Sequence, residues 1–424
     1  MKGIRPLLFI CGFSLQCLSL AAHGADDGAA AADPAEPAAA GSVDLSLSSR
    51  HGLDRDRRLA LAEYRAQLEA AGNPAPDWHT QAKLGWVTER KLDRQADTRL
   101  EVDALYARYE GERCGSRIGV QQVVWGGADR LQVLDVIHPL DLRESYFGDW
   151  QRKRLPLAML NVECGLGEQS IQLLLVPQTR FDRRPSTQGR FALPGVAAQL
   201  AARGIRIVDG GKPGAGEPAD WSGGAQWSGK AGEADVTLNA YRGWQGEQRY
   251  RPDGAVYRKE AARFHMVGAS YTRPIGPLVV RLEGARNRGI TGYARGAGGR
   301  LEPLDTRQTS YLLGVDYSTE PWFFSAQLFD RKQEADRPLA LPDRQRTATL
   351  AARRSLLQDR LHLTGYVAWD RIESASYASL TARYEFGPQL LGTAAIERFH
   401  GSARSFGLLE DQSRLLVGLE YHFK

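Results

Sequence analysis

The sequence predicts an all-β fold: a transmembrane, antiparallel, up-and-down β-barrel of about 16 strands, preceded by one short N-terminal periplasmic helix. Three observations predict it. Segments of about ten residues, with apolar and polar side chains alternating, recur from Trp78 to the carboxyl end. Short and long connections between these segments alternate along the chain. The final strand alternates in the same way and ends in aromatic residues.

The N-terminus has the pattern of a secretory signal peptide over residues 1–24. Lys2 and Arg5 precede an apolar run, and small residues surround the expected cleavage site after Gly24. The expected division of the chain is therefore a signal peptide at 1–24, a periplasmic leader and helix at 25–77, and an outer-membrane barrel at 78–424.

Residues 54–71 are predicted to form the periplasmic helix. Leu61, Tyr64 and Leu68 fall on one helical stripe, and Gly72 and Pro74 follow as stop signals. Two roles stay open for this helix. It could lie against the periplasmic rim of the barrel, or it could plug the barrel or dock a periplasmic export partner.

The strands after Trp78 have one apolar and one polar face. Near the carboxyl end, for example, Leu380, Ala382, Tyr384 and Phe386 alternate with Thr381, Arg383 and Glu385. Such strands suit a sheet with lipid on one side and water on the other. Aromatic residues recur near the turns, as a membrane-interface belt requires: Trp322 with Phe324, Tyr384 with Phe386, Tyr421 with Phe423, and Tyr271.

The connections support the same topology. Tight turns are expected near residues 111–112, 165–167, 273–276, 319–321, 357–359 and 387–388, and long links at 126–154, 181–220, 248–262, 287–308, 333–344 and 401–411. Outer-membrane barrels place short turns on the periplasmic side and long loops outside. The pattern predicts both termini on the periplasmic side.

Composition excludes several classes. The 424 residues have a net charge of +5 with both signs interspersed, which does not indicate nucleic-acid binding. The mean hydropathy is −0.40, and no apolar run after the signal is long enough for a spanning helix. Low hydropathy is compatible with a barrel because only alternate residues face lipid.

The last strand contains Gly418, Tyr421 and Phe423, a G-x-x-aromatic-x-aromatic ending. It resembles the terminal strand signal by which bacterial outer-membrane barrels are recognised for insertion. The resemblance implies location in the bacterial outer membrane, contact with its lipid, and recognition by barrel-assembly machinery. The alternative for this segment alone is the last strand of a soluble sandwich.

Cys114 and Cys164 are the cysteines left after signal removal, since Cys11 and Cys17 lie within the signal peptide. Cys114 begins one predicted strand and Cys164 ends the next, so both should lie at the same rim on neighbouring antiparallel strands. Adjacent strands bring Cα atoms within disulfide range, and the compartment is oxidising. We predict a disulfide, the alternative being two unpaired buried thiols.

Residues 125–144 match the pattern W-G-x-A-D-x-L-x-V-L-D-V-x-x-P-x-D-L-R-E. Together with residues 152–163, this segment resembles a family of uncharacterised porin-like outer-membrane proteins of Gram-negative bacteria, classed as a domain of unknown function. The resemblance implies an outer-membrane barrel, sometimes encoded beside export machinery for lipids or hydrophobic compounds. It implies no known activity.

The loop 126–154 is too apolar to extend into solvent, so we predict that it folds into the barrel and narrows the lumen. The residues expected to line the constriction are Asp129, Asp135, His138, Asp141, Arg143, Glu144, Arg152 and Arg154. The alternative is a loop packed for stability alone.

The predicted function is a porin-like channel for passive or export passage of a small or hydrophobic solute. The alternative is a non-conducting barrel that acts as a surface-interaction or export-assembly protein. The chain has no hydrolase, zinc-protease or P-loop motif, so no enzyme activity, cofactor or metal is expected. Asp135, His138 and Asp141 could form an acid–base or metal cluster, but such groups in a polar lumen are more often paired or solvated.

Overall fold

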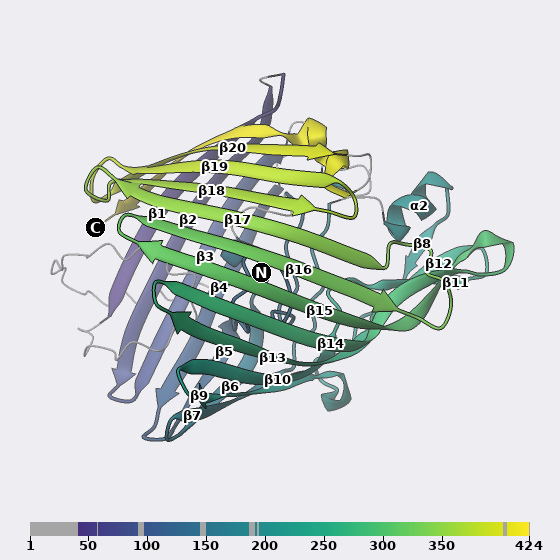
Figure 1. The fold of residues 1–424 in the computed structure, drawn as a ribbon, viewed down its shortest axis with the longest axis horizontal. Helices are drawn as coiled ribbons and strands as arrows, with labels where there is room; N and C mark the ends of the chain where they lie inside the picture. Colours follow the sequence, from purple (N-terminus) through teal and green to yellow (C-terminus); the bar gives the residue numbers. More distant parts are fainter. Residues whose placement is uncertain are drawn as a thin grey trace, which may run out of the picture.

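A computed structural model describes residues 41–56, 58–91, 97–144, 150–185, 191–192, 195–401 and 405–423. In this part of the chain, 18 strands form one antiparallel sheet that closes into a barrel (Figure 1). The first strand, β1 (Ser42–Leu53), pairs both with its sequence neighbour β2 and with the last strand, β21 (Arg414–Phe423). The sheet therefore has no free edge.

The remaining barrel strands follow in chain order, each paired with the next. They are β2 (Leu59–Ala75), β3 (Trp78–Lys91), β4 (Asp97–Glu110), β5 (Cys114–Gln121), β6 (Leu157–Leu166), β7 (Gln169–Val176), β9 (Ser222–Ala231), β10 (Ala234–Trp244), β13 (Arg263–Ile275), β14 (Leu278–Arg295), β15 (Leu301–Thr319), β16 (Trp322–Glu334), β17 (Arg344–Leu356), β18 (Leu361–Asp370), β19 (Ala375–Glu385) and β20 (Leu390–Gly401).

The other elements lie in the connections. A second sheet consists of β8 (Ile207–Asp209), β11 (Arg249–Asp253) and β12 (Val256–Glu260), and the helices are α1 (Trp150–Lys153), α2 (Val196–Ala202), η1 (Pro218–Asp220), η2 (Ala297–Gly299) and η3 (Ser405–Gln412). Within the described ranges, no helix combines the length and the apolar character needed to cross a membrane.

The predicted helix at residues 54–71 is wrong, because most of this segment belongs to strand β2. Its alanines and leucines fit a helical stripe, but from Ala62 to Ala70 apolar and polar residues also alternate strictly. Glu63, Arg65 and Gln67 occupy the inner face, and Arg65 forms ion pairs with Glu101 (2.6 Å) and Asp103 (3.5 Å) of β4. Pairing with neighbouring strands therefore overrides helix propensity here.

This correction accounts for the strand count. Of the strands that the structure describes, β1 and β2 precede Trp78, so the other 16 of the 18 barrel strands lie in the range predicted as barrel. Among the described residues the barrel begins at Ser42 rather than Trp78. The predicted signal peptide at 1–24 and the leader as far as residue 40 lie outside the described residues.

The two faces of the wall differ as predicted. On β21, Leu415, Val417 and Leu419 point outward and are about half exposed, whereas Arg414 points inward and is buried. The same apolar exterior continues around the ring, with Trp86, Leu238 and Leu350 among the exposed side chains. A closed barrel with an apolar outer surface is the arrangement of a protein in the bacterial outer membrane.

Short turns lie at one end of the barrel, the end at which β1 begins and β21 ends. Aromatic pairs predicted for the membrane interface lie at this end and are in ring contact: Trp322 with Phe324, and Tyr421 with Phe423. Because short turns mark the periplasmic side, this end is periplasmic and the long loops are extracellular.

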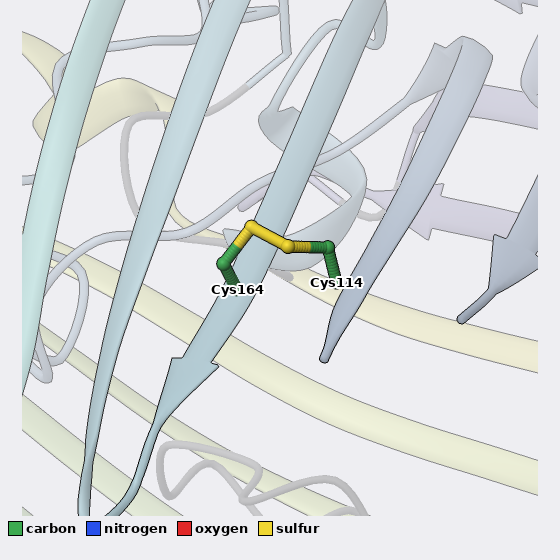
Figure 2. The surroundings of a disulfide bond; sticks show 2 residues. All are labelled: Cys114 and Cys164. Atoms are coloured by element: carbon green, nitrogen blue, oxygen red, sulfur yellow. A yellow bond between two sulfur atoms is a disulfide. The ribbon is translucent and has the colours of Figure 1, made fainter. Parts of the chain in front are cut away.

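The disulfide is confirmed between Cys114 on β5 and Cys164 on β6 (Figure 2). The two residues are direct register partners on adjacent strands. The bond encloses a chain separation of 50 residues, which includes the long connection between β5 and β6. It therefore fixes the base of the hairpin that carries this connection.

Replacing both cysteines with serine should lower the free energy of unfolding by about 2–4 kcal/mol, because the reduced chain regains loop entropy in the unfolded state. Urea titration of the protein in lipid vesicles measures this difference. The matched control is the wild-type protein treated with reductant, which should unfold at the same urea concentration as the double variant.

Candidate functional site

The connection between β5 and β6, residues 122–156, runs inside the barrel. We call it the lumen segment; the structure describes its residues 122–144 and 150–156. Its apolar side chains Leu131, Val133, Leu134 and Ile137 are buried in one core with inward-facing residues of β6, β7, β10 and β13–β16. The predicted inward fold of this loop is confirmed.

Two glycines in the wall make room for the lumen segment. An added Cβ at Gly268 of β13 would collide with the side chain of Leu134. An added Cβ at Gly224 of β9 would lie 2.7 Å from the ring of Trp125. Because these seats fit particular side chains, the segment is held at a defined position against this wall.

Polar contacts fix the beginning of the segment to the same wall. The side chain of Gln327 on β16 both donates to the Asp129 carboxylate (2.9 Å) and accepts from the Asp129 backbone N–H (3.0 Å). Ser325 also donates to this carboxylate (2.8 Å). Arg281 of β14 lies 3.6 Å from Asp129. Asp129 thus anchors the segment.

Asp135 and His138 hold the segment together from within. The guanidinium of Arg154 donates to the Asp135 carboxylate at 2.8 Å, and both side chains are buried. Nε2 of His138 accepts from the backbone N–H of Val123 (2.9 Å), and Nδ1 donates to the carbonyl of Leu155 (3.0 Å). His138 therefore joins the beginning of the lumen segment to its end.

Asp135, His138 and Asp141 do not form an acid–base or metal cluster. His138 uses both ring nitrogens on backbone groups, and the two carboxylates pair with different arginines. In the described ranges, no three histidine, cysteine, aspartate or glutamate side chains are placed to hold a metal ion.

Burial lowers the pKa of His138 from 6.5 to about 4, because the imidazolium would lose both water and the Val123 hydrogen bond. A depressed pKa stabilises the folded segment fully above pH 6.5, and this contribution is lost as the pH falls toward 4. We expect acidification from pH 7 to 4 to weaken docking of the lumen segment by about 3 kcal/mol. Increased current fluctuation in single-channel recordings measures this loosening.

The control for this prediction is His138→Gln, because a glutamine amide can replace both hydrogen bonds without titrating. This variant should lose the fluctuation that develops between pH 6.5 and 4. An unchanged pH response in the variant would show that another group is responsible.

The far end of the segment contacts the opposite wall. One carboxylate oxygen of Glu144 pairs with Arg50 of β1 (2.6 Å) and the other with Arg414 of β21 (3.0 Å). Gly268, the seat of Leu134, is on β13, which is nine strands from β1 in either direction around the ring. Between Leu134 and Glu144 the segment therefore crosses the lumen.

Other charged residues of the lumen segment also form ion pairs, both within the segment and with neighbouring elements. Arg143 pairs with Asp141 (2.6 Å), and Arg183, from the connection after β7, lies 3.5 Å from the same carboxylate. Arg152 lies 3.6 Å from Glu63 of β2 and is half exposed. Although burial opposes it, hydrogen bonding with Arg143 holds the pKa of Asp141 below its usual value.

The eight predicted constriction residues thus divide into two groups. Asp135, His138 and Arg154 are buried and hold the segment together, and Asp129 fixes it to the wall. The remaining four have partly exposed side chains in the lumen: Asp141, Arg143, Glu144 and Arg152.

Sequence reasoning missed Arg50, Glu63 and Arg183 as partners of this segment. Arg50 and Glu63 lie in the region read as leader and helix, although strict alternation around Glu63 could have revealed a strand. Lys153 lies near Glu144, and burial lowers the pKa of Lys153 to about 7. It therefore titrates near neutral pH.

The inner wall formed by β18–β20 has both a buried apolar cluster, which includes Tyr366, Tyr377 and Phe399, and small polar side chains. Thr364 of β18, Ser379 and Thr381 of β19, and Thr393 of β20 point inward and are only partly buried. These four hydroxyl side chains are therefore partly accessible to solvent, whereas Tyr366 on the same wall is covered by Arg130 of the lumen segment (4.2 Å to the ring centroid).

Comparison with known proteins gives a result at the level of fold. No protein-family model and no curated protein sequence matches the chain. Among solved structures, OccAB1 of Acinetobacter baumannii has a TM-score of 0.52 at 8% identity, covering 90% of this chain and 96% of that chain. OpdK of Pseudomonas aeruginosa has a TM-score of 0.50 at 11% identity, covering 90% and 98%.

These similarities place the chain among barrels of the outer-membrane porin fold. They agree with the closed ring, the apolar exterior and the inward segment described above. The narrower resemblance, carried by the pattern at residues 125–144, matches no family model and stays a prediction.

Proposed function

We propose that the protein is a porin-like outer-membrane channel, through which a small solute passes passively, and that the lumen segment forms its constriction. The observation that carries this proposal is the course of the segment from its seat at Gly268 to the Glu144 contacts on β1 and β21. An 18-stranded barrel is wide enough for an aqueous channel, and a segment across it reduces the open cross-section.

The side chains around the crossing favour a polar solute over a hydrophobic one. Asp141, Arg143, Glu144 and Arg152 present both signs of charge, and threonine and serine side chains of β18–β20 are partly exposed toward the lumen. Rings of one charge sign produce strong ion selection, whereas mixed signs close together produce weak selection. We therefore propose small polar or charged solutes without strong preference for either sign.

Planar-bilayer recording of the purified protein tests this function. Discrete conductance steps with weak cation or anion preference would support the proposal. Vanillate, present in one OpdK structure, is a suitable first solute for liposome-swelling assays. A protein that is folded by heat-modifiable gel migration and gives no steps at any voltage would refute the channel.

A second candidate function is surface interaction by a non-conducting barrel. The observation that favours it is the small sheet β8–β12–β11 with α2, which projects beyond the barrel (Figure 1). Val196, Leu200 and Tyr257 form a separate buried core there with Tyr293 and Leu301. Such a built extracellular structure could present a recognition surface. This alternative would be favoured if the protein gave no conductance and if its binding to a partner at the cell surface were lost on removal of residues 249–260.

A further inference from the structure

The outer surface of the barrel has an apolar hollow over strands β10–β17, with a volume of about 720 Å³. Its lining includes the small outward residues Ala269 of β13 and Gly284 of β14, together with Tyr271, Leu282 and Tyr311. Three charged residues, Asp330, Arg346 and Arg371, also belong to the lining. The hollow lies on the face of the wall that contacts lipid. Its walls and size suit a hydrocarbon chain.

A row of cations lies on the extracellular side of this hollow. Arg286 is the next outward residue after Gly284 on β14, about 7 Å further along the strand. The next outward position on β14 is Arg288. A row of four cationic or titratable residues passes through it on the consecutive strands β10, β13, β14 and β15, each the register partner of the next: Arg242, His265, Arg288 and Arg307. Arg288 and Arg307 are thus directly opposite, and like charges in this position repel.

The protein itself neutralises only part of this charge. Over the described residues, Arg242, Arg286 and Arg288 have no ion pair with a carboxylate, and Arg307 lies 3.6 Å from the highly exposed Asp336. Glu334 is the register partner of Arg307 and attracts Arg286 and Arg307, but its hydrogen bond is to Lys332 (2.8 Å). Asp330 pairs with Arg344 (2.7 Å) and Arg346 (2.8 Å). An external anion would relieve the repulsion between Arg288 and Arg307.

We propose that this surface binds a phosphorylated, multiply acylated glycolipid of the outer leaflet. One acyl chain occupies the hollow at Gly284, and a phosphate group lies among Arg286, Arg288 and Arg307. Arginine binds phosphate oxygens through charge-assisted, paired hydrogen bonds. The short distance between hollow and cations matches a lipid in which acyl chains and phosphates share one sugar headgroup. This site is separate from the lumen and does not depend on conduction.

Native mass spectrometry in neutral detergent tests the proposal with lipid A as the probe. We expect the wild-type protein to bind diphosphorylated lipid A at least tenfold more tightly than the same lipid without phosphates. The variant R286Q/R288Q/R307Q should lose this preference. The control is Arg273→Gln, an outward arginine at the periplasmic end of β13, which should retain it.

Two further measurements separate the lipid from a simple anion. Gly284→Leu fills the hollow and should weaken binding of both lipid forms, and inorganic pyrophosphate should not compete at equal concentration. Equal binding of both lipids, full binding by the triple variant, or effective competition by pyrophosphate would each overturn the proposal. Heat-modifiable migration confirms that each variant is folded, and R288Q alone replaces the triple variant if the latter is not.

Discussion

Replacement of residues 131–142 with a short glycine–serine linker should raise the single-channel conductance about three- to tenfold. These residues include the apolar cluster seated against β13 and the polypeptide that crosses toward β1 and β21. Without them the lumen of an 18-stranded barrel should be open to water over most of its cross-section. Planar-bilayer recording at fixed salt and voltage measures the change.

A matched control removes polypeptide of similar length outside the barrel. Substituting the same linker for residues 249–260, which form β11 and β12, should leave conductance within a factor of about two, since these strands lie beyond the lumen. If conductance stays unchanged after removal of residues 131–142, the lumen segment serves stability alone.

Asp135→Ala should release the lumen segment from its docked position. The change leaves the Arg154 guanidinium buried without its main partner, and breaking a buried ion pair in this way costs about 3–5 kcal/mol. We expect cleavage within the segment by added protease and large, irregular current fluctuations in single-channel traces. The wild-type protein should resist cleavage under the same conditions.

A double variant distinguishes loss of the charge pair from loss of packing. D135L/R154M replaces both charges with apolar groups of similar volume, a change that is often neutral or stabilising in a buried site. It should recover protease resistance and steady current. A double variant as sensitive as Asp135→Ala would mean that other contacts of these side chains hold the segment.

Period-2 alternation predicted most of the barrel because a membrane wall separates lipid from water at every strand. The prediction failed at β2, where Ala60, Ala62, Ala66 and Ala70 suit a helix as well as a strand. What decides between them is pairing with β1 and β3 along the whole element. That information is not local to the segment.

The candidate site shows the same division. Apolar residues such as Leu134 and Ile137 were enough to predict that the loop turns inward, because their burial is required wherever they lie. The partners of Glu144 could not be predicted, since Arg50 and Arg414 are far away in sequence and meet only when the ring closes. Closure therefore determines which predicted residues line the lumen.

The seam between β1 and β21 has a consequence for biogenesis. Arg50 stands on the first strand and Arg414 on the last, and a single carboxylate bridges them. In a nascent chain in which β1 has not yet paired with β21, only one of these arginines can reach Glu144. The lumen segment is therefore fully attached only when the barrel closes. An incompletely inserted molecule should for this reason conduct more ions than a completely inserted one.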